Sequence, residues 1–92
     1  MADAVVRNNT VLHRYELDAD GSTAFADYRL ADGVVVITHV KTPDQLRGRG
    51  IASKLVEGAL HMIRADGHKV IGRCSFARAY LDRHPEFTDL RA

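Results

Sequence analysis

The spacing of apolar residues changes once along the chain, at Pro43, and this change restricts the possible folds more than any other feature. Before Pro43, apolar and polar residues alternate in segments 11–17 and 22–30, and segment 34–40 is almost wholly apolar and rich in β-branched residues. After Pro43, apolar residues recur every three or four positions. Alternation indicates strands and the longer period indicates a helix. The sequence therefore predicts three strands followed by a helix.

Two turns separate the predicted strands. Residues 18–21 (Asp-Ala-Asp-Gly) follow the first strand and residues 31–33 (Ala-Asp-Gly) follow the second. Glycine supplies the positive φ that tight hairpin turns require. Because side chains alternate across a strand, one face of the first strand is expected to hold Val11, His13, Tyr15 and Leu17, and the other Leu12, Arg14 and Glu16.

The second half of the chain predicts two helices joined by a strand. The long helix starts at Ile51, runs for about four turns and is stopped by Gly67. A short strand follows over residues 69–72, and a second helix over residues 76–83 with Ser75 as its N-cap. The predicted order is β-β-β-α-β-α, an α+β (α/β sandwich) class in which two helices cover a mainly antiparallel sheet.

Length and composition are those of one globular domain. The chain has 92 residues, 46% of them hydrophobic and 27% charged, so we expect a single domain over residues 1–92, with residues 1–10 as an arm or an edge strand. A formal net charge of +1 gives no general attraction to nucleic acid or to a membrane. The single cysteine excludes an internal disulfide, and no apolar run has the length of a signal or a membrane span. We therefore expect a cytoplasmic protein with neither nucleic-acid nor membrane partners.

The segment Arg47-Gly48-Arg49-Gly50 lies between the predicted third strand and the long helix. The first N–H groups of a helix lack intrahelical partners, and the helix dipole makes that end positive. Glycines let an anion approach the backbone, and arginines add charged donors. These features predict a phosphate-binding turn. A plain helix-entry loop and an RNA-binding basic loop are the alternatives, although the segment occurs once and lacks interleaved aromatic residues.

The pattern Q-x-x-G-x-G at residues 45–50, followed by Ile51 and Ala52, resembles the acetyl-CoA signature of the GNAT N-acetyltransferase superfamily. Residues 15–90 resemble its small single-domain members, the GNAT-like family. The resemblance implies a GNAT-like fold, with the pyrophosphate of acetyl-CoA on the turn of residues 47–52 and its pantetheine arm between splayed strands. The acetyl-CoA contacts that it implies are Val40, Gln45, Leu46, Arg47, Gly48, Arg49, Gly50, Ile51, Ala52, Cys74, Arg78 and Tyr80.

The chain departs from this family pattern at two places. Relatives usually carry an acidic residue shortly after the strand histidine, where this chain reads Val40-Lys41-Thr42. They often read Cys-Pro-Phe where this chain has Cys74-Ser75-Phe76. The first departure removes a candidate carboxylate base.

Two side chains are candidates for catalysis. His39 falls on the predicted third strand, on the face of Val35 and Ile37, and an imidazole can take a proton from an amine near neutral pH. Cys74 precedes a predicted helix, whose dipole favours a thiolate nucleophile that could carry the acetyl group. A structural histidine and a buried, inert cysteine are the alternatives. No cluster has metal-ligand spacing, so we expect no metal.

Taken together, these features predict an acyltransferase, an acetyl-CoA-dependent N-acetyltransferase that acts on the amine of a small molecule or of a protein. The resemblance implies that the chain lacks much of the N-terminal region with which larger relatives wall the acceptor cleft. The cleft is then open to its acceptor or is completed by a second copy in a homodimer. The alternative is a non-catalytic module that binds CoA or another protein.

Overall fold

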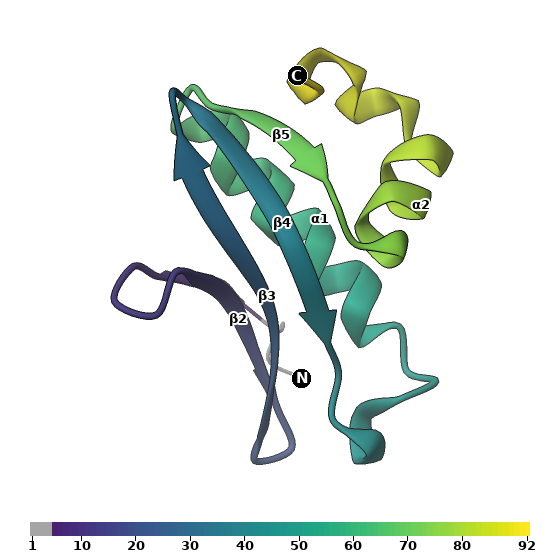
Figure 1. Cartoon of the computed structure of the whole chain (residues 1–92). Helices are drawn as coiled ribbons and strands as arrows, with labels where there is room; N and C mark the ends of the chain where they lie inside the picture. The colour runs from purple at the N-terminus through teal and green to yellow at the C-terminus, as the bar shows by residue number, and fades with distance from the viewer. Residues whose placement is uncertain (1–4) are drawn as a thin grey trace.

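Five strands form one sheet in the spatial order β1-β2-β3-β4-β5 (Figure 1). The computed structural model describes residues 5–92. Neighbouring strands from β1 to β4 pair antiparallel, and β5 pairs parallel to β4. The strands are β1 (Val6–Asn9), β2 (Arg14–Ala19), β3 (Ser22–Ala31), β4 (Val34–Lys41) and β5 (Lys69–Gly72).

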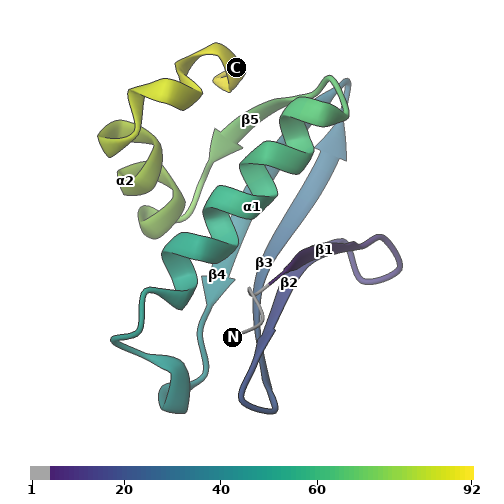
Figure 2. The same cartoon turned by 180° about the vertical axis from the view of Figure 1, so that it is seen from behind.

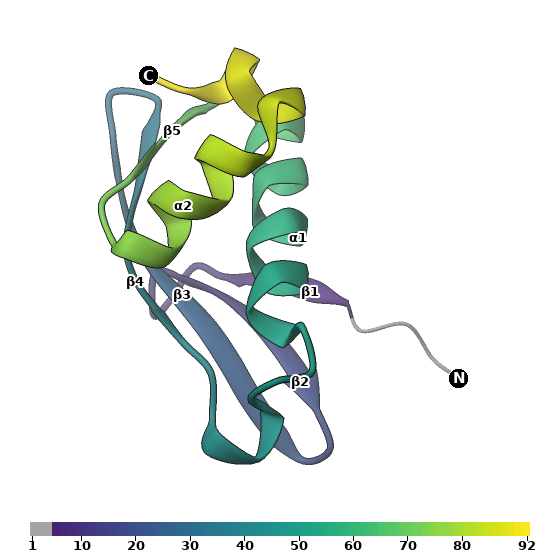
Figure 3. The same ribbon diagram turned by 90° about the vertical axis from the view of Figure 1, so that its right-hand side faces the viewer.

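Two helices complete the fold. Helix α1 (Ile51–Ala65) connects β4 to β5 and lies across one face of the sheet (Figure 2). Helix α2 (Ser75–Arg83) follows β5 and lies beside α1 (Figure 3). Two 3₁₀ helices, η1 (Asp44–Leu46) and η2 (Pro85–Leu90), precede α1 and follow α2. The predicted α+β class is confirmed. Strand β1 precedes the predicted strands in the chain and lies at the edge of the sheet, next to β2.

The core lies between α1 and the face of the sheet that it covers. One face of β2 and β3 supplies Tyr15, Leu17, Ala24 and Ala26, all buried. The apolar stripe of α1 packs on them, as its helical period predicts, and its buried members are Ile51, Leu55, Val56, Ala59, Leu60 and Ile63. Among residues 5–92, no helix combines the length and the apolar character needed to cross a membrane.

The predicted first strand starts three residues too early. Strand β2 begins at Arg14, because β1 pairs with β2 and residues 10–13 form the turn between them. His13 in this turn has a φ of 54°, and Val11 is 85% exposed. The alternation over residues 11–13 therefore does not mark a strand with a buried face.

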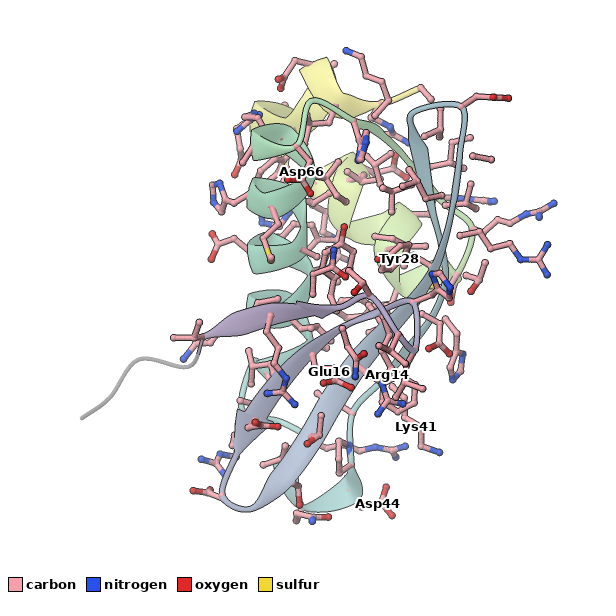
Figure 4. The ribbon with its side chains drawn as sticks, turned by 90° about the vertical axis from the view of Figure 1, so that its left-hand side faces the viewer. Arg14, Glu16, Tyr28, Lys41, Asp44 and Asp66 are labelled. Atoms are coloured by element: carbon pink, nitrogen blue, oxygen red, sulfur yellow. The ribbon has the colours of Figure 1, made fainter. Side chains whose placement is uncertain are left out.

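The opposite face of the sheet carries polar side chains, and one of them is buried. Glu16 of β2 is only 3% exposed. It pairs with Arg7 of β1 and with Arg14 of its own strand, beside which Figure 4 shows it. Asn9 adds a third hydrogen bond, at 3.2 Å. Burial raises the pKa of Glu16, but the hydrogen bonds from Arg14, Asn9 and Arg7 outweigh it and hold the pKa below its usual value. The carboxylate is therefore ionised and partnered on this face.

Candidate functional site

Strands β4 and β5 separate halfway along β4, which Figure 1 shows as a fork in the sheet. The parallel pairing ends where Ile37 meets Gly72. The N–H of Arg73 still donates to the carbonyl of Ile37 at 2.9 Å, after which the chain turns into α2. Within residues 5–92, residues 39–41 of β4 thus pair with β3 alone. Their other edge is free to accept an extended ligand.

A pocket of about 500 Å³ lies beside this free edge. The end of β4, the loop around η1, the first turn of α1 and the start of α2 enclose it. Its volume is in the range of small-molecule and cofactor sites. The lining residues are His39, Val40, Lys41, Thr42, Leu46, Arg47, Gly48, Gly50, Ile51, Ala52, Ser53 and Phe76.

The N-terminus of α1 opens into this pocket without a side-chain cap. Gly50 is the N-cap residue, with a φ of 72°, and no side chain among residues 5–92 caps the helix. Gly48 also has a positive φ, of 77°. A Cβ atom added to either glycine would meet no heavy atom of residues 5–92 within 4 Å. The backbone N–H groups of this turn therefore border empty space at the positive end of a helix dipole, an arrangement suited to an anion.

The polar side chains of the loop have different tasks. Arg49 forms an ion pair with Asp20 of the β2–β3 turn, and the amide of Gln45 donates to the hydroxyl of Ser22 in the same region. These two contacts hold the loop against the sheet, and neither side chain lines the pocket. Arg47 does line it, and its side chain is 72% exposed. Its Nε pairs with the exposed carboxylate of Asp44 at 3.3 Å, and of the predicted arginine contacts Arg47 is the one that lines the pocket.

The predicted orientation of His39 is wrong, because β4 contains a bulge. Tyr28 of β3 pairs with Ile37, whereas Asp27 pairs with His39, so Thr38 is an extra residue on β4. One extra residue reverses the alternation of a strand beyond it. His39 therefore points to the face of the sheet opposite α1, away from the face of Ile37.

The bulge leaves His39 exposed at the rim of the pocket, which it still lines. Its ring centroid is 6.5 Å from that of Phe25, a side chain of the same outer face. Val40, the next residue, turns inward and packs against the core. The imidazole is therefore accessible both to the pocket and to the open face of the sheet.

Cys74 caps α2, a role that the sequence assigned to Ser75. Its Sγ accepts a hydrogen bond from the N–H of Ala77 at 3.3 Å, the geometry of an N-cap residue. Ser75 is the first residue inside the helix and is exposed, so the predicted N-cap is wrong. Cys74 is half-buried and lies outside the lining of the pocket.

The predicted contacts on α2 lie farther from the pocket than expected. Tyr80 lines a smaller cavity of about 110 Å³, which shares Ser53 and Phe76 with the large pocket. Its ring stacks on His84 with centroids 3.8 Å apart. Burial, followed by two nearby glutamates, raises the pKa of the Tyr80 hydroxyl. Arg78 is exposed and lines neither cavity.

Comparison with known proteins assigns the family. The profile described as GCN5-related N-acetyl-transferase matches residues 14–90, nearly the whole chain. The chain belongs to the GCN5-related N-acetyltransferase family. A solution NMR structure of a GCN5-like protein from Staphylococcus aureus, proposed to be an N-acetyltransferase, has a TM-score of 0.73 and 24% identity. That match covers 100% of this chain and 91% of the other, and it shows the fold. No curated protein matches the sequence.

This family member also brings residues to the pocket that the sequence did not predict as contacts. They are Lys41, Thr42, Ser53 and Phe76. Phe76 had a detectable signal, because it is an apolar residue one position before the buried series Ala77, Tyr80 and Leu81, and therefore lies off the core face of α2. Among the residues that the structure describes, no group of three His, Cys, Asp or Glu side chains could hold a metal ion.

Proposed function

We propose that this protein binds acetyl-CoA in the 500 Å³ pocket and transfers the acetyl group to an amine. The observation that carries the proposal is that the uncapped, glycine-bordered N-terminus of α1 and the free edge of β4 border one pocket. The pyrophosphate would bind the N–H groups of α1. The amides of the pantetheine arm would pair with residues 38–41, and the thioester would lie where β4 and β5 diverge.

The charges around the pocket support this ligand. Lys41 and Arg47 line the large pocket, and Arg83 lines the smaller one. Over residues 5–92, neither cavity is lined by an Asp or Glu side chain. The negative charges of CoA would therefore meet cations in the lining, and the Asp44 carboxylate, which pairs with Arg47, lies outside it.

His39 is the residue best placed to assist the transfer. At the rim of the pocket its imidazole can take a proton from the acceptor amine, while an N–H of the free edge of β4 can donate to the thioester oxygen. Cys74 offers the second route, through an acetylated thiol. Cys74 lies outside the pocket lining, and its Sγ already accepts a hydrogen bond from the N–H of Ala77. We therefore favour direct transfer of the acetyl group from CoA to the amine.

Calorimetric titration with acetyl-CoA tests the binding site, and the loop provides a matched pair of variants. We expect Arg47→Gln to weaken binding about threefold to thirtyfold, because it removes a charged donor from the pocket. We expect Arg49→Gln to have a smaller effect, because that side chain pairs with Asp20 and does not line the pocket. Absence of saturable binding to the natural protein would overturn the proposal.

Release of CoA thiol in the presence of a primary amine separates an enzyme from a binding module. We expect His39→Gln to bind acetyl-CoA normally and to reduce turnover about 10²-fold to 10⁴-fold, the usual contribution of a general base. Cys74→Ala should keep turnover, and intact-mass measurement should find no acetylated thiol. Normal acetyl-CoA binding without turnover in the natural protein would favour the non-catalytic alternative.

A further inference from the structure

On the open face of the sheet, Asp27 of β3 lies directly across from His39 of β4. Opposed residues of an antiparallel pair have Cβ atoms about 4.5–5.5 Å apart. The residues on either side of Asp27, Ala26 and Tyr28, are buried in the core, so Asp27 points away from α1, as His39 does. Because His39 lines the pocket, the Asp27 carboxylate lies beside the pocket rim.

Within the described part of the chain, the Asp27 carboxylate has no cationic partner, although a cation is close in the sheet. Its neighbour on β2 is Arg14, whose guanidinium instead bonds to the buried Glu16 and lies 4.5 Å from the ring centroid of Phe25. Figure 4 shows Arg14 and Glu16 close together on this face. Among residues 5–92, no ion pair includes Asp27. A half-buried carboxylate without a partner favours a cationic ligand.

We propose that Asp27 binds the ammonium group of the acceptor, which makes the acceptor a cationic primary amine that enters from the open face of the sheet. This inference rests on the proposed function. Phe25, whose ring lies 6.5 Å from that of His39, offers an apolar surface to the carbon chain of such an amine. Lys41 pairs with Phe25 across the strands and borders the same site on the side of the loop of residues 47–50.

The arrangement accounts for each proton of the transfer. With the ammonium on Asp27, His39 takes one proton, and the neutral nitrogen attacks the carbonyl carbon of the thioester. The C–N bond forms, and the C–S bond breaks as CoA leaves as a thiolate. The thiolate takes the second proton from the nitrogen, and His39 passes its proton to solvent. Asp27 exchanges no proton in this sequence of steps and is an acceptor-binding residue.

Binding of n-butylamine, followed by NMR in the presence of saturating CoA, tests this proposal without requiring turnover. We expect saturable shifts of the Asp27 and His39 resonances, and a dissociation constant about threefold to tenfold larger in Asp27→Asn. Asp27→Glu keeps the charge and should bind more tightly than Asp27→Asn. Asp32→Asn is the matched control, because it removes the same charge in the exposed β3–β4 turn, and n-butanol is the uncharged control ligand.

The outcomes separate this inference from the proposed function. If CoA and acetyl-CoA do not bind the natural protein, the proposed function fails and the inference fails with it. If they bind, but butylamine leaves Asp27 and His39 unshifted or binds Asp27→Asn equally well, only the inference is overturned. Unchanged thermal unfolding of Asp27→Asn would show that any loss of amine binding reflects the missing charge.

Discussion

Gly48 offers a sharp test of whether the loop before α1 is a phosphate site or only a turn. Its φ is 77°, and a Cβ atom added to it would meet no heavy atom within 4 Å. Replacement by alanine therefore introduces no clash, and its cost is the strain of an L-residue in the left-handed region, about 1 kcal/mol. In a domain of this size, that loss lowers the melting temperature by roughly 4–8 °C.

The same substitution at Gly33 supplies a control with equal strain. Gly33 lies in the β3–β4 turn, has a φ of 76°, and is also surrounded by empty space. We expect Gly33→Ala and Gly48→Ala to lose the same stability in thermal unfolding followed by circular dichroism. They should differ in ligand binding, because Gly48 lines the pocket and Gly33 does not.

Calorimetry with acetyl-CoA then measures the difference between the two variants. A methyl group at position 48 occupies the space through which a phosphate would approach the backbone. Loss of about one charge-assisted hydrogen bond, or 1.5–3 kcal/mol, corresponds to an affinity roughly tenfold or more lower for Gly48→Ala. Equal affinities of the two variants would refute the reasoning and leave Gly48 with a role in the turn alone.

Three further substitutions test the fold and the pocket. Gly58→Ala should lower the free energy of unfolding by about 1–3 kcal/mol, because its Cβ would overlap Cγ2 of Val6. Val6→Ala should relieve part of that loss in chemical denaturation. Glu16→Gln should lower the melting temperature at pH 7. The pKa of Glu16 is lower in the folded protein than in the unfolded chain, so the ionised carboxylate stabilises the fold at pH values above the unfolded-state pKa. The natural protein should lose this stabilisation as the pH falls through the folded-state pKa. Phe76→Ala, at a partly exposed position that lines both cavities, should weaken acetyl-CoA binding about threefold to tenfold in calorimetry and change stability little.

Periodicity predicted the elements that have one buried and one exposed face. Helix α1 starts at Ile51, and β5 covers residues 69–72, both as predicted. Strand β1 has no such pattern, since its sequence is Val-Arg-Asn-Asn, with one apolar residue in four. Its place is set by pairing with β2 and by contact of Val6 with α1 at Gly58. Contacts between distant segments of this kind leave no local signal.

The sequence pointed to the loop that borders the candidate site, but it did not give the orientation of the side chains around that loop. The glycines of the loop and the start of α1 could be found because a strand, two glycines and a helix are consecutive in the chain. The different roles of Arg47 and Arg49 could not be predicted, because Arg49 forms its ion pair with Asp20, which lies in a different turn. The N-cap at Cys74 was missed because a serine follows it, and serine is the commoner cap.

The bulge at Thr38 shows why the least predictable part of the sheet is also the part best suited to chemistry. An unbroken β4 would place His39 in the core, on the face of Ile37, and would turn Val40 outward. The extra residue reverses the orientation of both side chains, at a point where β5 no longer pairs with β4. The free edge of β4, the exposed His39 and Asp27, which forms no ion pair within residues 5–92, thus lie close together in the sheet. Because alternation assumes regular pairing, a sequence pattern cannot reveal such a break, and breaks of this kind concentrate at functional sites.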